Sequence, residues 1–282
     1  MGEYTGRTVV ITGAGSGLGA AMADLFAGAG ANVALLDIDG ARAEAKAAAL
    51  REGGADAISV RVDVADKASL AAAAEAVRAT FGGCEVLCAN VGVQQFGAAD
   101  KLTDQDWSWL LSVNVMGVIH TVNAFLPMIR AKQTEGEGRR HIVLTSSASF
   151  FQFGVRLAAY VASKFAVTGY GEVLRQELAA EDINVTMVFP AGMATRHTES
   201  SIAARPVELG ESRLDRSDIE AMMASVDITR ESHVVSPEQA IRNLLTDLRE
   251  KEPYLITHGK YRDQVEARQR AVLRAFDRME AN

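Results

Sequence analysis

A glycine-rich stretch near the N-terminus, TGAGSGLG at residues 12–19, constrains this chain more than any other feature. It follows the apolar, β-branched run 8–11 and precedes residues 20–26, whose apolar positions recur at helical spacing. Without Cβ atoms such a turn can be tight and can bring backbone N–H groups close to a phosphate. The helix N-terminus adds free donors and a partial positive charge. Glycines also mark ordinary turns, but the flanking strand and helix favour a dinucleotide-binding turn here.

The length and composition are typical of globular α/β proteins. The chain has 282 residues, of which 48% are hydrophobic and 23% charged, enough to bury a sizeable core in one domain. The net charge of -7 and the pI near 5.4 argue against nucleic acid as a partner. No apolar run reaches membrane-spanning length, and the first strand begins too early for a signal peptide. We therefore expect no membrane partner and a cytoplasmic location.

The two cysteines and five histidines give no sign of a metal site. Cys84 and Cys88 lie beside or within a predicted buried strand, so we interpret them as core thiols, with a redox pair as the alternative. The histidines are scattered and form no pair with the spacing of metal ligands. We predict no bound metal.

Strand and helix patterns alternate along the chain. The apolar runs predict strands at 8–11, 31–37, 57–63, 85–90, 141–147, 184–190 and 253–257. Helices are predicted after the first strand and at 41–51, 66–80, 103–130, 158–180, 236–250 and 260–279, with a polar surface loop at 133–140. Thr103 and Ser236 are the predicted N-caps of two of them. The alternation predicts an α/β fold: a Rossmann-like, doubly wound, seven-stranded parallel sheet with helices on both faces, in a single domain over residues 1–282.

Two segments in the last third of the chain depart from this pattern. Between 192 and 236 the periodicity fades and the charge rises, which favours a substrate-covering lid with one or two short helices. A surface insertion without contact to the site is the alternative. The segment 258–282 contains a charged helix whose apolar positions are Val265, Val272, Leu273 and Phe276. We expect this helix to dock on its own domain or on a neighbouring subunit.

A carboxylate at the end of the second predicted strand indicates which cofactor binds. Asp37 lies 18 residues after Gly19, near the spacing of the acidic residue that binds the adenosine ribose in dinucleotide sites. A carboxylate there accepts hydrogen bonds from both ribose hydroxyls of NAD and repels a 2′-phosphate. The glycine-rich turn carries no arginine or lysine, and Arg42, the nearest cation in sequence, falls within the next helix. The sequence therefore predicts NAD rather than NADP.

A tyrosine and a lysine on the helix after the fifth predicted strand form the candidate catalytic pair. Because they are four residues apart, the phenol of Tyr160 and the ammonium of Lys164 share a helix face. A nearby cation favours the phenolate and lowers the tyrosine pKa, and such a phenol can take a proton from an alcohol or give one to a ketone. The spacing alone can arise by chance. Ser147, at the end of the fifth strand, strengthens the interpretation because it could hydrogen-bond the same substrate oxygen.

With these motifs the chain resembles the short-chain dehydrogenase/reductase family over nearly its whole length. The turn 12–19 looks like that family's cofactor turn, and Asp63-Val64 resembles its adenine-contacting pair. Asn90-Val91-Gly92 is similar to its Asn-Ala-Gly motif, with Val91 in place of alanine. Residues 190–195 resemble its Pro-Gly-x-Val-x-Thr segment, with Ala191 and Met193 as the replacements. Four residues match its catalytic tetrad in order and type: Asn114, Ser147, Tyr160 and Lys164.

The resemblance implies a role for each of these residues. Tyr160 would be the general acid/base, and Ser147 would orient and polarise the substrate oxygen. Lys164 would lower the tyrosine pKa and bind the nicotinamide ribose. Asn114 would hold a water that links Lys164 to solvent as a proton relay. The residues assigned in this way to NAD binding are Gly13, Gly15, Ser16, Gly17, Leu18, Gly19, Asp37, Ile38, Asp63, Val64, Asn90, Val91, Gly92, Tyr160, Lys164, Pro190, Gly192, Met193 and Thr195.

The function that we expect is that of an NAD-dependent oxidoreductase interconverting a secondary alcohol and a ketone. Phe150, Phe151 and Phe153 either line a wide apolar pocket, which would suit a bulky aromatic or alicyclic substrate, or pack beneath the lid. Arg156 either pairs with a substrate carboxylate or is a solvated loop residue. A dehydrogenase of a sugar, cyclitol or cyclic diol is the alternative, and a non-catalytic NAD sensor on the same fold is a more distant one.

The same resemblance implies self-assembly. The family commonly forms tetramers through the two long helices that would here carry Asn114 and Tyr160. The apolar faces of these helices are compatible with such contacts. We therefore expect a homo-oligomer, either a tetramer or a dimer.

Overall fold

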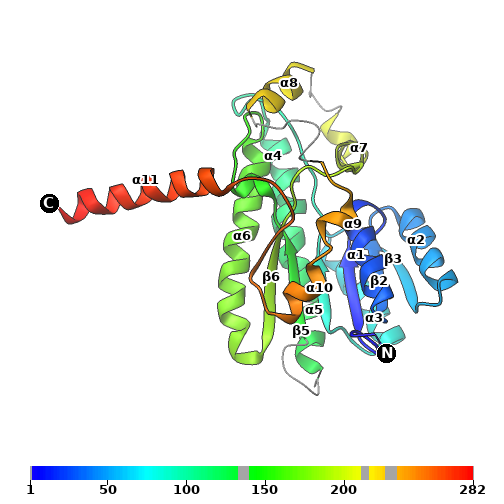
Figure 1. Ribbon diagram of the computed structural model, residues 1–282. Helices are drawn as coiled ribbons and strands as arrows, with labels where there is room; N and C mark the ends of the chain where they lie inside the picture. The colour runs from blue at the N-terminus through cyan, green and yellow to red at the C-terminus, as the bar shows by residue number, and fades with distance from the viewer. Residues whose placement is uncertain (1, 133–139, 211–215, 226–233, 282) are drawn as a thin grey trace.

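Seven strands form one parallel sheet in the order β3-β2-β1-β4-β5-β6-β7 (Figure 1). The computed structural model describes residues 2–132, 140–210, 216–225 and 234–281. The chain order along the sheet changes direction between β1 and β4, which is where parallel α/β sheets bind ligands at their carboxyl ends. The predicted fold class is confirmed. The strands are β1 Thr8–Thr12, β2 Asn32–Asp37, β3 Ala57–Arg61, β4 Val86–Ala89, β5 Arg140–Thr145, β6 Ile183–Phe189 and β7 Tyr254–Ile256.

Helices cover both faces of the sheet. Side chains of β1 alternate between the two resulting cores, with Val9 and Ile11 in one and Val10 in the other. Burial on both faces explains why the strands form continuous apolar runs in the sequence. The helices of the first core are α1 Gly17–Gly28, α2 Gly40–Glu52, α9 Pro237–Ala240 and α10 Leu244–Arg249. Those of the second are α3 Lys67–Phe81, α5 Gly117–Ala131 and α6 Ala158–Leu178.

The predicted helix 103–130 is confirmed, but it is not uniform. Thr103 caps α4 (Asp104–Leu111) in a capping box with Asp106, and a π-helical turn at Ser112–Met116 leads into α5. The stretch Asp104–Ala131 has 28 residues and is apolar enough to cross a membrane, which corrects the expectation that no segment reaches that length. In the structure α5 packs on the sheet as a core helix and buries residues such as Phe125 completely.

The predicted helix 236–250 is in fact two short helices. Ser236 caps α9 in a capping box with Gln239, and Pro237 is its first residue, as predicted. The helix ends at Ala240, and α10 begins at Leu244. Both Ile241, in the break, and Leu244 are buried in the core, so the apolar spacing that suggested one helix is satisfied by two.

The segment 192–236 lies above the carboxyl ends of the strands. It contains α7 (His197–Ala203), a 3-10 turn (Val207–Leu209) and α8 (Arg216–Ser225), and Figure 1 shows α7 and α8 together at this end of the molecule. The short helices agree with the prediction. Residues 211–215 and 226–233 of this segment, and 133–139 of the predicted surface loop, lie outside the described residues.

The C-terminal helix α11 (Arg262–Glu280) projects away from the body of the molecule (Figure 1). Arg268 anchors its root by donating a hydrogen bond of 2.8 Å to the carbonyl of Phe150. Further along, Val272, Leu273 and Phe276 are 45%, 50% and 52% exposed. The helix therefore contacts its own domain through Arg268, whereas its apolar positions further along the helix stay exposed.

The two cysteines are core residues, as predicted. Cys84 and Cys88 are both fully buried and free. Burial raises the pKa of each thiol well above its ordinary value. Buried, neutral thiols of this kind are chemically inert.

Candidate active site

The glycine-rich turn lies between β1 and α1 at the carboxyl end of the sheet. Gly13 and Gly17 adopt φ angles of 67° and 54°, a left-handed conformation that favours glycine. A Cβ at Gly19 would lie 2.2 Å from the carbonyl oxygen of Gly13, so the first turn of α1 packs directly on the loop. Within the described structure, the N-cap Ser16 makes no side-chain hydrogen bond to the helix. The N-terminal N–H groups of α1 therefore remain available to an anion.

Asp37, the last residue of β2, is fixed against this turn. Its Oδ2 accepts a hydrogen bond of 2.8 Å from the backbone N–H of Gly15, and its Oδ1 accepts one of 3.0 Å from Asp39. A Cβ at Gly15 would lie 3.0 Å both from this carboxylate and from the Cβ of Arg42. Arg42 thus lies beside the turn, but its guanidinium pairs with Asp39 at 3.0 Å. The carboxylate of Asp37 is therefore held in place beside the glycine-rich turn.

Asn90 joins three strand ends. Its backbone N–H donates to the Oγ1 of Thr12 at 3.0 Å, and its Nδ2 donates to the carbonyl of Thr12 at 3.2 Å. The Oγ1 of Thr145 donates to the Oδ1 of Asn90 at 3.0 Å. A Cβ at Gly13 would lie 3.3 Å from Asn90 and from Val91. The predicted segment 90–92 therefore lies against the glycine turn, held by two threonines that sequence reasoning did not single out.

Lys164 lies in the same crevice. Its Nζ donates to the carbonyl of Thr145 at 3.0 Å and lies 3.0 Å from the position of a Cβ at Gly92. Only 2% of the residue is exposed, and this burial lowers the pKa of the ammonium to about 8. The Nζ is 5.8 Å from the ring centroid of Tyr160. The predicted pair is thus brought together.

Ser147 lies beside Tyr160, as the predicted roles of the two residues require. Burial raises the pKa of the Tyr160 phenol, and hydrogen bonding by the Ser147 hydroxyl offsets part of that rise. The effect of Lys164 on this pKa stays a prediction. The ammonium is itself buried and donates to the carbonyl of Thr145. The Oγ of Ser147 also accepts a hydrogen bond of 2.8 Å from the hydroxyl of Ser149, another residue that sequence reasoning missed.

Asn114 lies in the π-helical turn and is fully buried. Its Oδ1 accepts from the backbone N–H of Val93 at 2.8 Å, and its Nδ2 donates to the carbonyl of Val93 at 2.8 Å and to the hydroxyl of Ser163 at 3.0 Å. The side chain therefore fixes the loop after β4 to α6. These bonds use both amide hydrogens and leave one lone pair of Oδ1 for a further donor.

The other predicted cofactor segments occupy the two sides of the crevice. The methyl group of Thr195 is 3.4 Å from the position of a Cβ at Gly17, so the segment 190–195 reaches the glycine turn. His258, which sequence reasoning missed, braces this segment through its Nε2, 2.9 Å from the carbonyl of Gly192. The carboxylate of Asp63 accepts a hydrogen bond of 2.9 Å from Ala65. Val64 is buried against α5, where its methyl group lies 2.6 Å from the position of a Cβ at Gly117.

A second histidine that sequence reasoning did not single out lies over the catalytic tyrosine. His197 is the first residue of α7, and its ring centroid is 6.5 Å from that of Tyr160. Burial lowers the pKa of the imidazole to about 4, and the charge of Lys164 acts in the same direction. The feature of the sequence that could have pointed to His197 as a site residue is its place two residues after Thr195, which ends the predicted cofactor segment 190–195.

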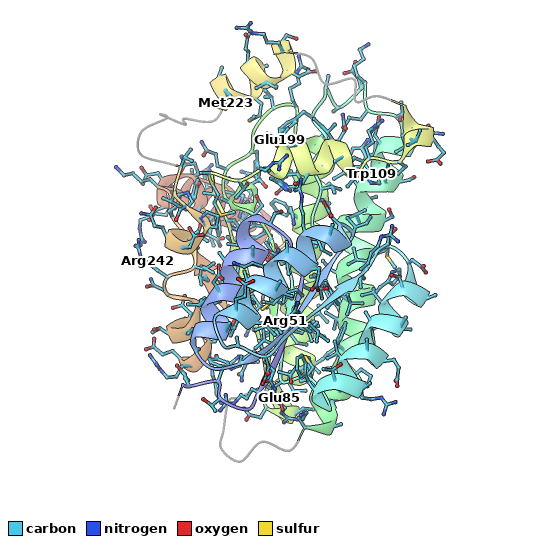
Figure 2. All side chains as sticks on the ribbon, turned by 90° about the vertical axis from the view of Figure 1, so that its right-hand side faces the viewer. Arg51, Glu85, Trp109, Glu199, Met223 and Arg242 are labelled. Atoms are coloured by element: carbon cyan, nitrogen blue, oxygen red, sulfur yellow. The ribbon has the colours of Figure 1, made fainter. Side chains whose placement is uncertain are left out.

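A buried ion pair holds α7 over the site. Arg205 and Asp106 are joined at 2.7 Å, with both side chains 7% exposed, and the guanidinium lies 5.6 Å from a ring centroid of Trp109. In Figure 2, Trp109 on α4 and Glu199 on α7 lie at the same end of the molecule, whereas Glu85 lies at the opposite end. Within the described part of the segment 192–236, α7 therefore lies against Tyr160.

The three phenylalanines after β5 form a ring cluster at the root of α11. The Phe150 centroid is 4.6 Å from Phe165 and the Phe151 centroid 4.8 Å from Phe189, while the guanidinium of Arg268 lies 5.1 Å from Phe150 and 5.5 Å from Phe153. Their partners come from α6, β6 and the C-terminal helix. The expectations of a pocket lining and of packing beneath the lid did not include these contacts. Arg156 is a partly solvated loop residue whose side chain is 37% exposed, and its Nε pairs with Asp218 of α8 at 3.1 Å.

No group of three or more His, Cys, Asp or Glu side chains in the described part of the chain could hold a metal ion. The predicted residues from Asp37 to Lys164 and Tyr160 thus lie together around the glycine-rich turn at the carboxyl end of the sheet.

The family model described as short chain dehydrogenase matches residues 7–206. The C alpha-dehydrogenase of Sphingobium sp. is 31% identical over 286 residues, covering 100% of this chain and 90% of that protein. The D-threitol dehydrogenase of Mycolicibacterium smegmatis is 34% identical over 190 residues, covering 67% of this chain and 71% of that protein. A short chain dehydrogenase/reductase from Burkholderia phymatum, solved in complex with NAD, superposes with a TM-score of 0.85 at 30% identity, covering 96% of each chain.

Proposed function

Since the chain belongs to the short-chain dehydrogenase family, we propose that it is an NAD-dependent oxidoreductase that interconverts a secondary alcohol and a ketone. The observation that carries this proposal is the place of Lys164, whose Nζ lies 5.8 Å from the ring centroid of Tyr160 and 3.0 Å from the position of a Cβ at Gly92 in the predicted cofactor segment 90–92. A non-catalytic NAD sensor is not retained. The relatives are dehydrogenases, and the four tetrad residues are present.

The crevice fits NAD. Gly13, Gly15 and Gly17 leave the backbone open to the pyrophosphate, and the free N–H groups at the start of α1 receive it. Asp37, fixed by Gly15, accepts from the ribose hydroxyls and repels a 2′-phosphate. When bound, NAD supplies the hydride acceptor for the carbinol carbon. The NAD-bound relative from Burkholderia phymatum supports this choice of cofactor.

The protein residues handle the proton. In alcohol oxidation the deprotonated Oη of Tyr160 takes the hydroxyl proton of the substrate, and Ser147 orients that oxygen by a hydrogen bond. In ketone reduction the protonated phenol gives its proton to the carbonyl oxygen. Lys164 would bind the nicotinamide ribose through its ammonium. The remaining lone pair of the Asn114 Oδ1 can accept a hydrogen bond from a water, and this water passes the proton toward solvent.

The segment 192–236 acts as a lid over this site. Gln94, in the loop after β4, donates from its backbone N–H to the hydroxyl of Ser201 at 3.0 Å and from its Nε2 to the hydroxyl of Thr198 at 2.7 Å. Together with the ion pair of Arg205, these bonds hold α7 over Tyr160 and exclude water from the reacting atoms.

The substrate is a bulky secondary alcohol, aromatic or alicyclic, or the matching ketone. The C alpha-dehydrogenase, which matches the whole chain, supports dehydrogenation of an alcohol, whereas the phenylalanine cluster packs against Arg268 of α11 and gives no support for the size of the substrate. A polyol is the second candidate. It is favoured by the D-threitol dehydrogenase and by the polar ring of His197 over Tyr160.

The protein works as a homo-oligomer in the cytoplasm. The half-exposed apolar side chains of α11 support self-association, since such a stripe is rarely left in water. The two free, buried thiols fit a reducing compartment. Equilibrium sedimentation at micromolar concentration tests the assembly, and a monomer there would contradict it.

The function is tested by NADH formation with NAD and a panel of secondary alcohols, comparing the wild-type protein with Tyr160→Phe. We expect Tyr160→Phe to bind NADH with unchanged affinity and to lose roughly 10²- to 10⁴-fold in kcat. Turnover by Tyr160→Phe at a near wild-type rate would overturn the mechanism. A wild-type protein that binds NAD but oxidises no alcohol, and reduces no ketone with NADH, would overturn the proposed activity.

A further inference from the structure

The imidazole of His197 lies near Tyr160, and the proposed chemistry does not use it. Its ring is tilted by 59° to that of Tyr160, with 6.5 Å between the centroids. Lys164 is close enough for its charge to act on the imidazole. The low pKa of His197 keeps the ring neutral at physiological pH, so that one nitrogen donates a hydrogen bond and the other accepts one.

The ring nitrogens are free to bind a ligand. Among the described residues, the hydrogen bond made by His197 is through its backbone carbonyl, which accepts from the hydroxyl of Ser201 at 2.7 Å. Both ring nitrogens of His120 are sealed in the protein without a partner, whereas those of His197 are not. A polar ring at the edge of a substrate site gains most from a hydrogen-bonding partner on the substrate itself.

The ring is also held in a fixed position. Ser201 is 2% exposed and accepts from the backbone of Gln94, and Thr198 is bonded to the side chain of the same glutamine. Gln94 directly follows Val93, whose backbone N–H and carbonyl are bonded to the side-chain oxygen and nitrogen of Asn114. The position of His197 is therefore fixed relative to the catalytic residues by a short series of hydrogen bonds, as a specificity-determining group requires.

We propose that His197 hydrogen-bonds a second oxygen of the substrate, on the carbon next to the one that is oxidised, so that the enzyme favours vicinal diols and alcohols with an oxygen on the adjacent carbon. The proposal rests on the function proposed above. Tyr160 and Ser147 bind the reacting oxygen, and the imidazole faces the same phenol ring. A small substrate can contact both groups at once only if its two oxygens are close neighbours along its carbon chain.

The test uses a matched pair of substrates, a phenyl-substituted ethanediol and a phenylpropanol in which a methyl group replaces the second hydroxyl. The key variant is His197→Phe, which keeps an aromatic ring over Tyr160 but removes both nitrogens, and His197→Asn restores a polar group. Glu199→Gln is the control on the same helix, because Glu199 is exposed and pairs with Arg196 at the surface. Thermal melting and NADH binding confirm that each variant is folded.

We expect the wild-type protein to favour the diol in kcat/KM, and His197→Phe to lose roughly two- to tenfold on the diol, mainly through KM, with little change on the mono-alcohol. His197→Asn should recover part of the loss, and Glu199→Gln should match the wild type. Equal losses on both alcohols, or a wild type without preference for the diol, would overturn the role of His197 while leaving the proposed function intact. Failure of the wild type to turn over either alcohol would overturn the proposed function and, with it, this inference.

Discussion

The ammonium of Lys164 donates a hydrogen bond of 3.0 Å to the backbone carbonyl of Thr145, the last residue of β5. The side-chain hydroxyl of the same threonine holds Asn90 at the end of β4. One strand end thus fixes both the lysine and the wall of the cofactor crevice. The phenol of Tyr160, beside this lysine, has a pKa raised by burial.

The two directions of the reaction should respond to pH with opposite sign. Because burial raises the pKa of Tyr160, the phenol is protonated at neutral pH, which suits proton donation to a ketone. Alcohol oxidation needs the phenolate and should accelerate as the pH rises toward that pKa, while ketone reduction should slow over the same range. Initial rates in both directions across the alkaline range check this. Oxidation that is fastest below neutral pH would contradict it.

Asp37 should control the choice between NAD and NADP. We expect Asp37→Ser to weaken NADH binding roughly ten- to hundredfold, because hydrogen bonds to a charged group are lost, and to improve NADPH binding because the like charge is removed. Arg42, beside the turn, is then the nearest cation to a 2′-phosphate. Fluorescence titration gives both dissociation constants. Asp24→Asn, which removes a surface carboxylate paired with Lys46, is the control and should change neither.

The ion pair of Arg205 and Asp106 should keep the lid closed. Arg205→Met leaves the carboxylate of Asp106 buried without its partner, at a local cost of about 3–5 kcal/mol. We expect a higher KM for the substrate and faster proteolysis within 192–236, with the sheet core unchanged. Arg196→Ala, which breaks an exposed pair with Glu199, is the matched control and should behave like the wild type.

The ion pair of Arg205 and Asp106 should weaken in acid. Burial alone would raise the pKa of Asp106, but hydrogen bonds from Thr103 and the pairing with Arg205 outweigh it and lower that pKa. The pairing therefore stabilises the lid at neutral pH and is lost as the pH falls through the lowered pKa. Proteolysis of the wild-type lid should approach that of Arg205→Met in acid. A lid equally resistant at acidic and neutral pH would argue against this role of Asp106.

The sheet could be predicted because its strands are buried on both faces, so that each forms a continuous apolar run bounded by turns. The ends of these runs already indicated Asp37, Asn90 and Ser147, since the carboxyl ends of parallel strands meet at one edge. The π-helical turn around Asn114 could not be predicted, because one extra residue per turn barely disturbs the apolar spacing of a long helix.

The lid contacts could not be predicted because they join distant parts of the chain. Asp106 and Arg205 are nearly a hundred residues apart, and neither carries a local pattern that points to the other. The position of His197 over Tyr160 depends on the same folding of 192–236. The raised pKa of Tyr160 follows from burial, which the spacing to Lys164 does not report.

Gly19 should be required for both stability and cofactor binding, whereas Gly28 at the other end of α1 should not. A Cβ at Gly19 would lie 2.2 Å from the carbonyl oxygen of Gly13, so Gly19→Ala must displace either the helix or the turn. Overpacking of this kind typically costs about 1–3 kcal/mol. At Gly28 a Cβ meets nothing within 4 Å, and Gly28→Ala should be neutral or stabilise by up to about 1 kcal/mol. Urea unfolding and NADH titration of the two variants check both effects, and equal unfolding midpoints would show that the turn tolerates a side chain that this structure excludes.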